Sequence, residues 1–146
     1  MFRFLKIRFA ARTVEDPVFG VLKLEGGLWT GETLFAPLGR TLQIMVKAGE
    51  EGPSESQREH YRQVEERYPE LTRAIEQALR QLVRDVGAGP PGDSRFEDFT
   101  LESMAIDPVN DGPVRWELWF GWSHDPEWAF TVYLEDWRVV DTGAVH

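Results

Sequence analysis

The sequence predicts a single α+β domain in which an antiparallel β-sheet packs against one kinked helix or a pair of helices. Three observations support this fold class: strand-like segments bounded by turn signals at both ends of the chain, a helical periodicity confined to the middle, and no alternation of strands with helices. The 146 residues form one domain, 1–146, that is long enough to bury a hydrophobic core.

The N-terminal part, residues 1–49, is predicted to be a β meander. Residues 2–9 mix Phe, Leu and Ile with Arg and Lys and favour a strand, because the charges interrupt the apolar run that a signal peptide needs. Glu15-Asp16-Pro17 is typical of a turn. Further strands are expected, by alternation and flanking turn residues, at 18–25, 28–35 and 40–47.

The middle part, residues 54–86, carries a helical pattern. Ser54 and Gln57 have the spacing of a capping box, and an apolar stripe follows at intervals of three and four. The stripe consists of Tyr61, Val64, Tyr68, Leu71, Ile75, Ala78 and Leu82. Pro69 lies within it, which predicts either two helices that meet there or one helix kinked there.

The C-terminal part is predicted to be a set of β hairpins, 96–146, joined to the helix by a loop at 87–95. The loop, GAGPPGDS and its neighbour, is rich in Gly and Pro. Alternation of apolar residues predicts strands at 99–106, 114–120, 128–134 and 137–140.

The formal net charge is −9, and it is distributed unevenly along the chain. Residues 1–49 hold seven basic and four acidic side chains, residues 50–86 hold six and nine, and residues 87–146 hold three and twelve. Nucleic acid is not an expected partner, because binding it requires Lys and Arg to replace counterions on phosphates. The acidic C-terminal part favours a protein partner with a basic surface, or serves only to keep the protein soluble.

The composition excludes several kinds of site. The chain has no cysteine, which excludes disulfides, thiolate metal sites and cysteine nucleophiles and fits a reducing compartment. No stretch approaches the roughly 20 apolar residues that span a bilayer, so a cytoplasmic location without a membrane partner is predicted. No GxSxG, Walker or GxGxxG motif is present, so no catalytic residue, cofactor or metal ligand is assigned.

Aromatic residues concentrate between Trp116 and Trp137, a segment that holds five of the six tryptophans. Trp119 falls on the opposite strand face from Trp116, and Trp122 follows a glycine at the strand end. Together with Tyr133 they could form an exposed aromatic patch of the kind that dominates binding interfaces. The alternative is that the helical part covers this face and buries the same side chains.

One polar cluster, His124-Asp125-Pro126-Glu127, has the residue types that bind a divalent metal or perform acid–base chemistry. Its spacing matches no metal motif, and Asp125-Pro126 is a strong turn signal, which favours a hairpin loop.

Two other polar features carry less information. The stretch from Asp107 to Gly112 resembles a calcium loop, but Leu118 stands where the EF-hand pattern requires glutamate, which favours a turn. His60 precedes the apolar stripe by one residue and is expected on the helix surface, and the terminal His146 gives no signal.

Three stretches of the chain, taken in order, form a recognisable combination. They are Asp16-Pro17-Val18-Phe19-Gly20 followed by Trp29, then Gln57 with Tyr61 at the start of the helix, then residues 122–143, WSHDPEWAFTVYLEDWRVVDTG. This order resembles an uncharacterised bacterial family with a DPxFG start, a tryptophan strand, a Gln/Tyr helix and a late W-x-DPE-like turn before a final hairpin. The resemblance covers residues 16–146. It implies no activity, but small acidic α+β proteins of this kind are similar to immunity proteins, which neutralise toxins encoded beside them.

These observations favour a non-catalytic, immunity-protein-like module that binds a basic partner through an acidic, aromatic-rich face. The expected contact residues are Trp119, Trp122, Asp125, Glu127, Tyr133, Glu135 and Asp136. Two alternatives remain: a metal-assisted enzyme that uses His124, Asp125 and Glu127, and a homo-oligomeric structural module that buries the aromatic residues between subunits.

Overall fold

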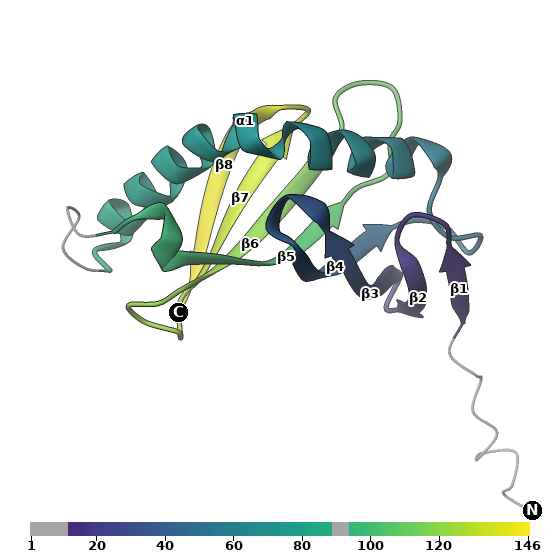
Figure 1. Ribbon diagram of the computed structural model, residues 1–146, viewed down its shortest axis with the longest axis horizontal. Coiled ribbons are helices and arrows are strands. Elements are labelled where there is room, and N and C mark those ends of the chain that lie inside the picture. Colours follow the sequence, from purple (N-terminus) through teal and green to yellow (C-terminus); the bar gives the residue numbers. More distant parts are fainter. Residues whose placement is uncertain (1–11, 89–93) are drawn as a thin grey trace, which may run out of the picture.

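A computed structural model describes residues 12–88 and 94–146 as one eight-stranded sheet with a long helix across one of its faces (Figure 1). The elements follow the chain as β1 (Thr13–Asp16), β2 (Gly20–Glu25), β3 (Leu28–Phe35), β4 (Arg40–Lys47), α1 (Glu55–Val86), β5 (Phe99–Ile106), β6 (Arg115–Trp122), β7 (Ala129–Glu135) and β8 (Arg138–Val145). Short 3-10 turns, η2 (Ala36–Leu38) and η3 (Phe96–Asp98), precede β4 and β5. The α+β class is confirmed, while the strand predicted at 2–9 and most of the predicted 87–95 loop lie outside the described residues.

The strands lie in the sheet in chain order, and every neighbouring pair is antiparallel except β4 and β5. The expectation of a wholly antiparallel sheet was therefore wrong at one pair. The reason is the length of α1, whose 32 residues extend roughly 48 Å at 1.5 Å per residue. A connection of that length carries the chain back across the sheet, so β5 starts at the same end as β4 and runs parallel to it.

α1 is one helix that continues through Pro69, which excludes the predicted pair of helices. Its start is the predicted capping box: Ser54 Oγ accepts a hydrogen bond from the Gln57 amide at 3.1 Å, and Gln57 Oε1 accepts one from the Ser54 amide at 3.0 Å. The helix bends along its length in Figure 1, as a proline that lacks one backbone hydrogen bond would cause. None of the helices in the described residues is long and apolar enough to span a bilayer.

The core lies between α1 and the sheet, where the helix stripe meets alternate strand residues. The buried helix positions follow the predicted stripe, except that Leu79, fully buried, takes the place assigned to Ala78 and that Val83 is also fully buried. His60 is also buried, with 5% of its surface exposed, so its expected position on the helix surface was wrong. It packs between the rings of Trp116 and Trp137, which β6 and the β7–β8 turn bring under the helix.

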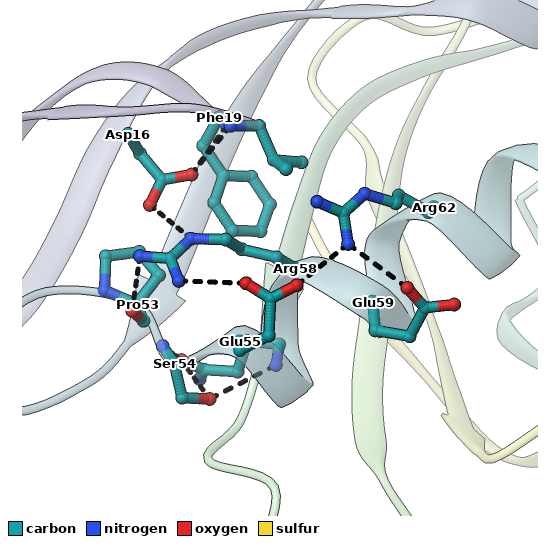
Figure 2. A network of polar contacts seen from close by, with 10 residues as sticks. Asp16, Phe19, Pro53, Ser54, Glu55, Arg58, Glu59 and Arg62 are labelled. Carbon is teal, nitrogen blue, oxygen red and sulfur yellow. Dashed lines mark hydrogen bonds and ion pairs between the residues drawn. The ribbon is translucent and has the colours of Figure 1, made fainter.

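A buried ion pair fastens the first turn of α1 to the end of β1 (Figure 2). Asp16 Oδ1 accepts a hydrogen bond from Arg58 Nε at 2.8 Å, and Asp16 Oδ2 accepts from the amides of Val18 and Phe19, both at 2.9 Å. The Asp16 side chain is 1% exposed and that of Arg58 is 21% exposed, so the carboxylate of the pair is shielded from water. The hydrogen bond to Asp16 is the largest cause of a raised pKa for Arg58.

Gln57 joins the two halves of the sheet. Its Nε2 donates to the carbonyl of Lys47, at the end of β4, at 2.8 Å and to the carbonyl of Asp107, just after β5, at 3.1 Å. One turn later, the Tyr61 hydroxyl donates to the Leu34 carbonyl in β3 at 3.0 Å. These side chains satisfy backbone carbonyls at the parallel pair and under the helix, where water is excluded.

Candidate protein-binding face

The strands β5–β8 have one face turned toward α1 and one turned away from it. In β6, the side chains of Trp116, Leu118, Phe120 and Trp122 belong to the core under the helix. Alternation therefore directs the residues between them to the other side of the sheet. We call this side the open face and define it by Glu102, Glu117, Trp119, Thr131, Tyr133, Glu135, Asp141 and Gly143. Among the described residues, no helix covers it (Figure 1).

The two tryptophans that the sequence placed together in a patch lie on opposite faces. Trp119 is half-buried on the open face, where its register partners are Ser103 of β5 and Thr131 of β7. Trp122 is 5% exposed and packs against Phe99 within the core, so its expected role at the contact surface was wrong. The cause is that β6 continues through Gly121 to Trp122, which keeps Trp122 in phase with the core positions.

Tyr133 lies at the centre of a polar row on the open face. The register pairs it with Glu117 of β6 on one side and with Asp141 of β8 on the other. Directly opposed Cβ atoms lie about 5 Å apart, so residues that carry carboxylates flank Tyr133 on both neighbouring strands. The ring also lies beside Gly143, where an added Cβ would come within 3.5 Å of the Tyr133 ring.

A hollow of about 450 Å³ opens beside this row. Glu117, Tyr133, Glu135 and Asp141 line it together with Val140. A β-bulge shapes its β8 side, since the register passes from Tyr133–Asp141 to Leu134–Val139 and leaves Val140 without a partner. Bulges of this kind redirect side chains at sheet edges.

Charge in the hollow is predominantly negative. Asp107, Glu117, Glu135 and Asp141 contribute carboxylates, while Arg115 contributes the single guanidinium among its lining residues. Arg115 Nε lies 3.8 Å from Glu135 Oε1, with 70% of the arginine side chain exposed. An ion pair this long and this exposed contributes little to stability, so the two side chains can move apart at a small cost in free energy.

Another carboxylate, that of Glu102, extends the open face toward β5. The register of β5 and β6 shifts between Leu101 and Ser103, so Glu102 is the bulged residue. Its carboxylate lies directly over Gly121, at the position that a side chain on residue 121 would occupy. Trp119 therefore has a carboxylate on each side along the direction of β6. Glu117 precedes it by two residues, and Glu102 lies over Gly121, two residues after it.

Asp136, expected at the contact surface, instead closes the β7–β8 turn. It has a positive φ of 49°, and its Oδ1 accepts a hydrogen bond from the Val114 amide at 2.9 Å. Its carbonyl accepts the indole N–H of Trp116 at 2.7 Å. These bonds hold the turn against the start of β6, so we assign Asp136 a structural role, while Glu135 beside it lines the hollow.

Asp125 and Glu127 lie at the other end of β7, in the connection from β6, and so are separated from the hollow by the length of that strand. Asp125 Oδ1 accepts the Glu127 amide at 3.0 Å, as expected for a hairpin loop closed by an aspartate. This hydrogen bond, and a second from His146, lower the pKa of Asp125. The predicted contact residues therefore occupy four places: the open face, the β6–β7 loop, the β7–β8 turn and the core.

The metal-ligand set suggested by the sequence is not assembled. His124 Nε2 lies 3.1 Å from Asp98 Oδ2 rather than beside Asp125 and Glu127. His146 takes that place, with Nε2 at 3.1 Å from Asp125 Oδ2, and the ligand atoms of Asp125, Glu127 and His146 lie within 4.8 Å of one another. No sequence spacing indicates this trio, because β8 has to return alongside β7 before residue 146 meets the loop.

Sequence reasoning also missed three carboxylates of the open face. Glu102 could not be placed on this face, because the bulge in β5 breaks the alternation there. Glu117 could have been found, since it stands two residues before Trp119 and therefore shares its strand face. Asp141 could not, because the bulge at Val140 changes the alternation within β8. Val139 and Ala144 both pack against the core although five positions separate them, which a regular strand does not allow.

The first two of the three stretches that carry the resemblance to a bacterial family have structural roles. Asp16 closes the turn after β1 by accepting a hydrogen bond from the amide of Phe19, whose side chain is buried in the core. Gln57 and Tyr61 donate hydrogen bonds to carbonyls of the strands. None of these four residues lies on the open face, whereas the third stretch, residues 122–143, contributes Thr131, Tyr133, Glu135, Asp141 and Gly143 to it. No protein-family model, no curated protein and no solved structure matches the chain, so the resemblance stays a prediction and the function has to be argued from the open face itself.

Proposed function

We propose that this protein is a non-catalytic binding module whose open face binds a basic protein partner. The observation that supports this best is the position of Trp119 and Tyr133 among carboxylates on a sheet face that no described helix covers. Large aromatic side chains supply much contact area at little conformational cost, and they dominate binding energy when a partner excludes water from them.

The charges on this face define the chemistry of the partner. Glu102, Glu117, Glu135 and Asp141 lie around the two aromatic residues, and the partial pairing of Glu135 with Arg115 leaves the field negative. A negative field attracts a basic protein surface and raises the rate of encounter, while it repels nucleic acid. An immunity-type function fits this chemistry, since a toxin that acts on nucleic acid presents a basic surface of its own.

The test is a capture experiment from the native host with a matched pair of variants. The open-face variant carries Glu102→Gln, Glu117→Gln and Asp141→Asn, and the control variant carries Glu51→Gln, Glu66→Gln and Glu70→Gln. Both lose the same three charges, and the control residues are exposed and lie off the open face. All substitutions are close in shape to the native side chains, so both variants should keep their fold.

We expect the wild type and the control to capture the same basic protein and to release it as salt is raised. The open-face variant should capture about tenfold less, because its carboxylates no longer attract the partner. Equal capture by both variants would contradict the proposal. Recovery of the protein alone, with a dimer in light scattering, would instead favour the homo-oligomer.

A further inference from the structure

We propose that the hollow beside Tyr133 is a specific subsite for an arginine side chain of the partner. This inference rests on the proposed function and adds to it the identity of the group that the open face recognises. The hollow has a volume of about 450 Å³ and opens on the face that no described helix covers.

The first argument is charge complementarity. Arg115 and Glu135 are partners at the rim, at 3.8 Å. Within the described residues, neither Glu117 nor Asp141 forms an ion pair, although both line the same hollow. A cation that enters the hollow would meet two carboxylates at once, and charge-assisted hydrogen bonds of this kind are about twice as strong as neutral ones.

The second argument is the position of the Tyr133 ring. The register places the Tyr133 backbone between Glu117 and Asp141, in one row across three strands, and the ring leans along β8 over Gly143. A cation held between these carboxylates lies within reach of the ring and gains a cation–π contact. The ring lies next to Gly143 of β8, where an added Cβ would be in ordinary van der Waals contact with it.

The third argument is the apolar wall. Val140, the bulged residue of β8, is 43% exposed and lines the hollow next to the carboxylates. A long basic side chain has a methylene stem that packs on apolar surface while its charged end reaches polar groups. Val140 can therefore pack against the methylene stem, while Glu117, Tyr133 and Asp141 contact the charged end.

The geometry favours arginine over lysine. A guanidinium is planar, presents five N–H donors, can bond two carboxylates together and can stack on an aromatic ring. A lysine ammonium is a compact and more strongly hydrated charge, which loses more on leaving water and stacks less well. A hollow lined by Glu117, Asp141 and the aromatic Tyr133 matches the guanidinium.

The experiment measures binding of a short glycine peptide that carries two arginines and of its counterpart with two lysines. Backbone amide shifts of the full-length protein report both the affinity and the location. We expect the arginine peptide to move the signals of Glu117, Tyr133 and Asp141 and to bind about threefold or more tightly than the lysine peptide. The double variant Glu117→Gln with Asp141→Asn should lose about tenfold in affinity.

Substitutions of Tyr133 separate the ring from the charges. Tyr133→Phe keeps an aromatic face and should keep the preference for arginine, whereas Tyr133→Leu should abolish the preference. Glu66→Gln with Glu70→Gln serves as the charge-matched control and should bind like the wild type.

Equal affinity for the two peptides, or shifts located away from the hollow, would overturn the inference. So would an unchanged affinity in the Glu117→Gln, Asp141→Asn variant. Each of these results leaves the proposed function standing if the partner is still captured through the open face. The reverse result, arginine binding in the hollow but partner capture that ignores the open-face charges, would contradict the proposed function alone.

Discussion

His60 is the residue whose chemistry depends most on its position in the fold. Its ring stacks on Trp137 at 5.0 Å between centroids and meets Trp116 edge-on at 5.3 Å. The guanidinium carbon of Arg67 lies 4.7 Å from the ring centroid of the same Trp137. His60 Nε2 is buried without a hydrogen-bond partner in the described residues. Burial lowers the pKa of His60 to about 4.

We expect this histidine to make stability depend on pH. Because the folded-state pKa lies below the ordinary 6.5, the unfolded chain takes up a proton first as pH falls, and stability is lost between about pH 6.5 and 4. At 1.36 kcal/mol per unit the loss is about 3 kcal/mol. Urea unfolding at about pH 7 and about pH 4.5 measures it.

His60→Phe is the control, because phenylalanine keeps a ring between the two tryptophans but cannot be protonated. Carboxylates such as Asp98 and Asp125, whose pKa values are lowered by hydrogen bonds, add their own loss of stability at low pH in both proteins. The difference between the two proteins therefore isolates His60. A variant with the same pH slope as the wild type would disprove the assignment.

Asp16 is the second residue whose environment sets its contribution. Its carboxylate is 1% exposed and accepts hydrogen bonds from Arg58 and from two amides of the following turn (Figure 2). We expect Asp16→Ala to lower the free energy of unfolding by about 3 kcal/mol, because it leaves Arg58 and both amides without their acceptor.

Glu55→Gln is the comparison for Asp16, since Glu55 pairs with the same arginine at 3.2 Å but is 69% exposed. Its loss should cost much less than the loss of Asp16, as for other surface ion pairs. Chemical denaturation of both variants gives the two values. If Asp16→Ala cost no more than Glu55→Gln, the buried pair would not be holding the helix to β1.

At the scale of elements, α1 decides how the two meanders of the sheet are joined. Gln57 uses its amide group to close the capping box and to bind the carbonyls at the ends of β4 and β5. The side chain is 1% exposed, so these three bonds have no competition from water.

We expect Gln57→Glu to destabilise the fold although it is nearly isosteric. The new carboxylate keeps the bond to Ser54 but faces two carbonyl oxygens that it cannot bond while ionised, which should cost about 2 to 3 kcal/mol. Gln77→Glu, exposed on the same helix, provides the matched control and should change stability by less than about 0.5 kcal/mol. Equal thermal midpoints for the two variants would contradict this role.

For the whole molecule, the fold separates stability from the proposed contacts. The apolar residues that hold the structure lie between α1 and one face of the sheet, and the ion pair and the Gln57 bonds lie at the same helix. The open face carries carboxylates and two aromatic rings. These side chains contact only their neighbours on the same face and are not part of the core under the helix. Neutralising the open face should therefore change binding without unfolding the protein, as the capture experiment requires.

Local patterns in the sequence anticipated the elements with good accuracy. The bounds of β3, β4 and β5 agree with those predicted from alternation, and the capping box located the start of α1. Helix and strand periodicities act over a few residues, so a linear sequence reveals them. β1 was missed because Asp16 and Pro17 are turn residues, and β8 was expected to end at residue 140 because its bulge breaks the alternation.

Local sequence patterns were enough to predict the fold class, the position of most strands, the helix start and the concentration of acidic and aromatic residues in the C-terminal part. Tertiary structure alone decided the parallel pairing of β4 with β5, the burial of His60 and Trp122, and the meeting of Glu117, Tyr133 and Asp141 in one row. The physical reason is that register, bulges and the face that a long helix covers arise from contacts between residues far apart in the chain, which no local pattern contains.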